Sequence, residues 1–133
     1  MKIYARWLFG TAAAFNIALG LALLFLRPQL AGWLGIDAVE GENLVLGNLA
    51  GLLAGLIGCI YAFISADPAR YRPIIGLAVI GKLLAVVCVI VPWLRGEISA
   101  ALPVLVIGDV LYAVLFTDYL RRTRAHASGG RFG

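Results

Sequence analysis

Two charged residues, Lys82 and Asp109, are the best candidates for chemistry in this chain. Lys82 falls near the middle of the apolar run 74–91, and Asp109 near the middle of the apolar run 98–120. An ionisable side chain at the centre of a bilayer costs about 3 kcal/mol, so it normally faces protein or water and has a partner. A paired lysine and carboxylate could lock two helices together, or could hold one mobile proton for transport or catalysis.

Other polar residues are expected at similar depths. Asn16 lies near the centre of the first apolar run, and Tyr112 shares the helical face of Asp109. Asn48 lies in the outer half of the second run. We therefore predict an intramembrane polar cluster of candidate binding residues: Lys82, Asp109, Asn16, Tyr112 and Asn48. A Lys82–Asp109 ion pair would join antiparallel third and fourth helices, and Asn16 and Tyr112 would complete its hydrogen bonding.

The composition indicates that lipid surrounds the elements that carry these residues. The chain has 133 residues, is 62% hydrophobic and only 14% charged, and has a mean hydropathy of +0.97. A soluble domain of this size could not hide so much apolar surface. The predicted fold is an all-α bundle of four transmembrane helices in one domain, 1–120, followed by a basic tail, 121–133, that we expect to be disordered. The expected spans are 7–26, 44–65, 74–91 and 98–120, with an interfacial segment at 28–36.

The basic residues predict the orientation of these spans. Only Arg27 and Arg95 fall in the loops of one side. Because cytoplasmic loops carry an excess of Lys and Arg, both termini are expected to be cytoplasmic. The other, richer side carries Lys2, Arg6, Arg70, Arg72, Arg121, Arg122, Arg124 and Arg131.

The charged residues at the inner membrane boundary are expected to form ion pairs along a helix or to contact lipid headgroups. Asp118 can reach Arg121 or Arg122 at helical spacing. Arg70 and Arg72 could bind anionic headgroups, although the orientation bias alone is sufficient to explain them.

Glycines in the second run form a stripe suited to helix packing. Gly47, Gly51 and Gly55 are spaced four residues apart, and Gly58 follows. Small residues at this spacing let another backbone approach closely. We expect the stripe to pack against a helix of the same chain, with a homo-oligomer or a larger membrane complex as the alternative. Similar small-residue spacing occurs in the first and third runs, at Ala14, Ala18, Ala22, Gly81 and Ala85.

Several functional classes find no support in the sequence. Cys59 and Cys88 lie inside apolar runs, and the single histidine, His126, is in the tail. Metal, haem and disulfide frameworks are therefore not expected, and we predict no cofactor. No nucleotide-binding glycine loop, nucleophile elbow or HExxH motif occurs. Since the basic residues flank apolar runs, membrane lipids are the expected partners and nucleic acid is not.

Four short motifs carry a resemblance between this chain and a known group of proteins. They are Asp67-Pro68-Ala69-Arg70 before the third run, Gly81-Lys82 within it, Trp93-Leu94-Arg95-Gly96-Glu97 after it, and Gly108-Asp109-Val110-Leu111-Tyr112 in the fourth run. With these motifs the chain resembles the DoxX-like small membrane proteins of bacteria, many of them uncharacterised. The resemblance implies a four-helix bundle in the bacterial inner membrane. It implies no catalytic roles.

Three functions remain open on the sequence. The favoured one is a non-enzymatic structural or accessory membrane subunit with a dry, fully paired Lys82 and Asp109. A proton-coupled small transporter would instead need a water-accessible Asp109. A lipid-modifying enzyme of the sterol-isomerase type would need a lipid-sized cavity beside the pair.

Overall fold

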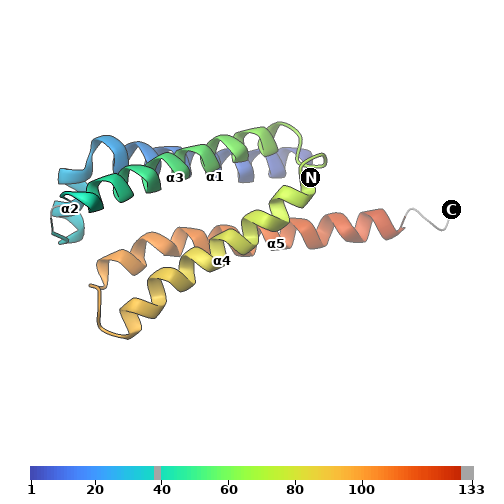
Figure 1. Ribbon diagram of the computed structural model, residues 1–133. Coiled ribbons are helices and arrows are strands. Elements are labelled where there is room, and N and C mark those ends of the chain that lie inside the picture. The colour runs from blue at the N-terminus through green and yellow to red at the C-terminus, as the bar shows by residue number, and fades with distance from the viewer. Residues whose placement is uncertain (38–39, 130–133) are drawn as a thin grey trace. The chain divides into compact units, whose positions relative to one another are not determined.

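The computed structural model describes residues 1–37 and 40–129, of which 125–129 are described by their backbone alone. Within these residues the secondary structure is entirely helical, so the all-α prediction is confirmed. The helices are α1 (Lys2–Phe25), α2 (Arg27–Leu34), α3 (Glu42–Ala66), α4 (Arg72–Leu94) and α5 (Ala101–Gly129) (Figure 1). Each helix except α2 is long and apolar enough to cross a membrane, as predicted. The chain divides into two compact units, Met1–Pro68 and Ala69–Gly133.

The first unit is built on the contact between α1 and α3, which lie side by side in Figure 1. Gly20 of α1 faces the α3 backbone so closely that a Cβ atom there would lie 2.7 Å from the Gly51 carbonyl oxygen. Further along α3 in the same interface, a Cβ atom on Gly58 would lie 2.8 Å from the backbone nitrogen of Ile17. Real Cβ atoms are not found at such distances, so both glycines are required for this helix pair to close.

The glycine stripe of α3 is thus used inside the chain, as predicted for Gly51 and Gly58. Gly55 takes part through its own backbone, which lies against Gly20, while Gly47 is half-buried.

The small residues noted on the other helices lie largely outside the two helix contacts described here. Ala14 and Ala18 are exposed, and α1 instead presents the face of Ala13, Ile17 and Gly20 to α3. In α4, Gly81 and Ala85 are exposed, because the adjacent Lys82 occupies the buried face. A stripe of small residues shows where two helices can approach closely. When several helices carry such a stripe, the spacing alone does not identify which of them are in contact.

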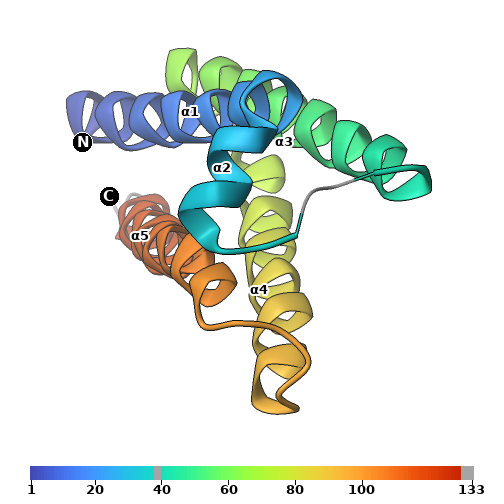
Figure 2. The same ribbon diagram turned by 90° about the vertical axis from the view of Figure 1, so that its left-hand side faces the viewer.

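The segment expected at the interface is the short helix α2. Pro28 stands at its start, where a missing N–H is harmless, and Gly35 ends it in the left-handed conformation with φ 63°. Trp33 is 89% exposed, as suits an aromatic ring at a membrane boundary. Figure 2 shows α2 turning away from the end of α1.

The second unit consists of the helix pair α4 and α5, which cross one another in Figure 1 and lie next to one another in Figure 2. Its buried apolar side chains include the fully enclosed Ile75 of α4 and Phe116 of α5. Pro92 lies inside α4, whereas the sequence predicted that this proline would follow the helix end at Val91. The helix ends at Leu94, so the proline falls in its last turn, where little of the hydrogen-bond ladder remains to be broken.

The prediction of a disordered tail at 121–133 was wrong for residues 121–129, which continue α5. No proline interrupts this stretch, and an ion pair between Asp118 and Arg122, 2.8 Å apart at i,i+4 spacing, supports the helix where it leaves the apolar segment. Residues 130–133 lie outside the described part of the chain. The packing of all four long helices into a single bundle stays a prediction.

Candidate functional site

The predicted ion pair between Lys82 and Asp109 is present. Lys82 Nζ donates to Asp109 Oδ1 at 2.6 Å, a distance typical of a strong charge-assisted hydrogen bond. The lysine side chain is 5% exposed and the aspartate side chain 19% exposed. The two charges that the sequence places in separate apolar runs therefore neutralise each other at the contact between α4 and α5.

Helix periodicity brings both charges to this contact. Lys82 follows Ile75 by two helical turns, and both are buried on the same face of α4. On α5, Asp109 lies between the buried Val106 and Ala113, at the three- and four-residue steps of one helical face. The ion pair is therefore flanked by apolar contacts of the helix pair.

Tyr112 lies beside the pair through its ring, whereas the hydrogen bond predicted for it stays a prediction. The Lys82 Nζ atom lies 5.6 Å from the centroid of the Tyr112 ring, within the range of a cation–π contact. The ring also packs at 5.9 Å from that of Phe116, one turn further along α5. Lys82 is thus held by a carboxylate and an aromatic face of the same helix, which leaves it little freedom to move.

The two asparagines of the predicted cluster belong to the first unit. Asn16 is 6% exposed, and its Nδ2 donates to the Ala12 carbonyl oxygen at 3.0 Å within α1. Asn48 is half-buried on α3. Their predicted place beside Lys82 and Asp109 stays a prediction.

The lining of the grooves in the second unit bears on the chemistry open to the pair. A proton-transfer group must reach its substrate, directly or through one water. Two grooves are described between α4 and α5, and neither is lined by Lys82, Asp109 or Tyr112. Instead, each charge of the pair is satisfied by a residue of the facing helix.

A second tie between α4 and α5 was not found from the sequence. Arg72 donates from Nη2 to the Leu120 carbonyl oxygen at 2.6 Å, and from Nη1 to the hydroxyl of Thr123. Thr123 in turn donates to the Tyr119 carbonyl oxygen at 2.9 Å. Arg72 therefore joins α4 to α5 directly. The signal available in the sequence was a basic residue at the start of one helix opposite a hydroxyl residue near the end of its antiparallel neighbour.

Comparison of the chain with protein-family models, with curated proteins and with solved structures gave no match at a significant level. The helices, the ion pair and the second tie are thus the grounds on which a function can be argued.

Proposed function

We propose that this chain is a small multi-pass protein of the bacterial inner membrane, similar to the DoxX-like group, that acts as a non-enzymatic structural or accessory subunit. Both termini face the cytoplasm. Lys82 and Asp109 serve as a clamp that sets the register and angle of α4 and α5. The observation that carries the proposal is the closed contact between the two charges, 2.6 Å apart.

The energetics of buried charge support this role. A lysine left alone in lipid would be expensive, and its cost falls when a carboxylate on the next helix neutralises it. Only one register of α4 against α5 brings the two charges together, since a slip of one residue would turn either charge to another face. The pair therefore contributes to choosing one arrangement among many apolar ones.

Polar contacts at two levels of the helix pair strengthen the argument. Arg72 joins the start of α4 to α5, and Lys82 joins the two helices further along. Together they fix α4 against α5 at two levels. A rigid helix pair with an apolar outer surface suits a protein whose work is to pack beside other membrane components.

Transport and lipid modification remain as rival functions for the same residues. Both require that water or a substrate reach Asp109, which is 19% exposed. Neither function has an observation in its favour beyond the presence of two ionisable groups.

A double-mutant cycle on Lys82→Met and Asp109→Leu tests the clamp. We expect each single variant of the full chain, unfolded reversibly in detergent micelles, to lose about 3–5 kcal/mol, because a buried charge is left without its partner. The double variant should recover most of that loss. Asp118→Asn is the matched control, since its surface pair with Arg122 should contribute less than about 1 kcal/mol.

A proton-flux measurement separates the clamp from the rivals. Proteoliposomes with a pH-sensitive dye inside should show the same passive flux for the native chain and the double variant. Small or additive losses in the cycle, together with flux that disappears in Asp109→Leu, would overturn the structural role and favour proton transfer.

A further inference from the structure

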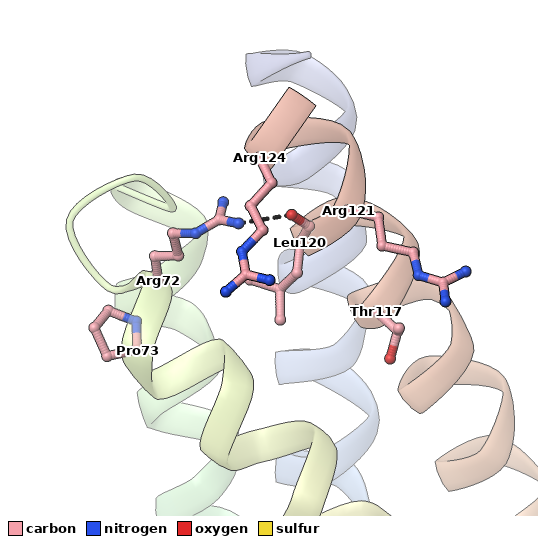
Figure 3. Close-up of a pocket in the computed structure, with 6 residues that line it drawn as sticks. All are labelled: Arg72, Pro73, Thr117, Leu120, Arg121 and Arg124. Carbon is pink, nitrogen blue, oxygen red and sulfur yellow. Dashed lines mark hydrogen bonds between the residues drawn. The ribbon is translucent and has the colours of Figure 1, made fainter. Parts of the chain in front are cut away.

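A groove lined by arginines lies at the end of the α4–α5 pair where α4 begins. It has a volume of about 460 Å³ and is lined by Arg72, Pro73, Thr117, Leu120, Arg121 and Arg124 (Figure 3). We call it the arginine groove. In Figure 3, Arg124 points toward Arg72, whereas Arg121 points away from both. The groove thus gathers three positive charges from two helices.

These charges lack acidic partners. Ion pairs among the described side chains join Lys82 to Asp109, Arg95 to Glu97 and Arg122 to Asp118, and the arginines of this groove belong to none of these three pairs. Arg72 uses two of the five N–H donors of its guanidinium in the hydrogen bonds to Leu120 and Thr123, so further donors remain for a ligand. Guanidinium groups held near one another without a carboxylate repel, and an anion with several oxygens would relieve that repulsion.

A second groove continues from the first along the helix pair. It has a volume of about 380 Å³ and shares Thr117 and Arg121 with the arginine groove. Its walls are mainly aliphatic, and we call it the apolar groove. They include Val79 and Leu83 of α4 and Val110 and Val114 of α5. A charged end and an apolar channel therefore meet at Thr117 and Arg121.

The length of the apolar groove fits one leaflet of a bilayer. From Arg121 to Val110 the rise of α5 is about 16 Å at 1.5 Å per residue. The hydrocarbon of one leaflet is about 15 Å thick. A molecule with its anionic group among the arginines would extend an acyl chain along Val114 and Val110 to the middle of the membrane.

We propose that the two grooves together form a binding site for one anionic phospholipid. Its phosphate accepts hydrogen bonds from Arg124, and from Arg121 once that exposed side chain turns toward the groove, with Arg72 holding the groove in shape. One acyl chain lies along the apolar groove. Asp118 lines the apolar groove, where it is paired with Arg122, and no carboxylate lines the arginine groove itself to receive the ammonium group of a zwitterionic headgroup. In the proposed orientation this lipid belongs to the cytoplasmic leaflet.

Lipid binding to the full chain in a neutral detergent tests the site. Native mass spectrometry would compare phosphatidylglycerol, phosphatidylcholine and soluble glycerol phosphate, each added to the native chain. We expect phosphatidylglycerol to bind best, phosphatidylcholine more weakly and glycerol phosphate hardly at all. The double variant Arg121→Gln with Arg124→Gln should bind phosphatidylglycerol about thirtyfold more weakly, since each basic residue contributes about a factor of five. Both side chains are exposed, so the variant should keep its fold.

Two further variants make the result decisive. Lys2→Gln with Arg95→Gln removes the same net charge at exposed positions that line neither groove and should leave the affinity within about twofold. Val114→Trp should weaken phosphatidylglycerol binding by filling the apolar groove, because Val114 is exposed and its substitution leaves the core intact.

Three outcomes would overturn the proposal. Equal losses in the two double variants would show attraction by overall charge without a defined site. Glycerol phosphate that binds as tightly as the lipid would make the arginine groove a site for soluble anions. Unchanged binding in Val114→Trp would remove the acyl chain from the apolar groove.

Discussion

Gly20 of α1 and Gly55 of α3 lie backbone to backbone, so that a Cβ atom on Gly20 would be 2.7 Å from the Gly55 nitrogen. This contact sets the spacing of the first helix pair. In lipid, where apolar side chains gain little by leaving the solvent, such close packing is a main source of helix association. Gly20 is therefore the position where the first unit is most sensitive to added volume.

Gly20→Ala should destabilise the chain by about 1–3 kcal/mol, because the new methyl group must push the α3 backbone away. Reversible unfolding in detergent micelles measures the loss. Gly76→Ala is the control, since nothing lies within 4 Å of its added Cβ, and alanine in a helix should be neutral or favourable. Equal effects of the two substitutions would contradict the close approach at Gly20.

Arg72→Gln should cost about 2 kcal/mol, because the hydrogen bonds from a charged donor to Leu120 and Thr123 are lost. The end of α5 should also exchange its amide hydrogens faster, which hydrogen–deuterium exchange can measure over 121–124. Arg95→Gln is the matched control at the other end of α4. Arg95 is 69% exposed and 4.0 Å from Glu97, so its loss should change stability by less than about 0.5 kcal/mol.

The proposed orientation predicts which loop an impermeant thiol reagent can reach in intact cells. In a Cys59→Ala, Cys88→Ala background, Ser99→Cys should be labelled, because the loop between α4 and α5 would face outward. Ala69→Cys, in the loop before α4, should be labelled only after the membrane is opened. Both positions are exposed in the structure, so access depends on the side of the membrane. The reverse pattern would invert the orientation.

The sequence was sufficient for the features that rest on simple membrane energetics. Long apolar runs predicted the four candidate spans, and the cost of a charge in lipid predicted that Lys82 and Asp109 would meet. Tyr112 followed from its helical spacing to Asp109. These inferences are local, or involve two residues that stand out against an apolar background.

Features that depend on competition between similar surfaces were harder to predict. The contact at Gly20 could not be predicted, because alanines at regular spacing occur on another face of α1 as well. The exact helix ends also differ, since α1 begins at Lys2 and α5 extends through Gly129. Helix ends depend on capping and on tertiary contacts such as that of Arg72, which apolar runs do not reveal.

The separation of the ion pair along the chain has a consequence for biosynthesis. Asp109 is made 27 residues after Lys82. At about 5–20 residues per second, the lysine waits on the order of one to five seconds before its counter-charge leaves the ribosome. If α4 entered the lipid alone in that interval, the unpaired ammonium group of Lys82 would be placed in hydrocarbon. We therefore expect α4 to remain at the insertion machinery until α5 arrives, so that the two helices pass into the bilayer as a neutral hairpin.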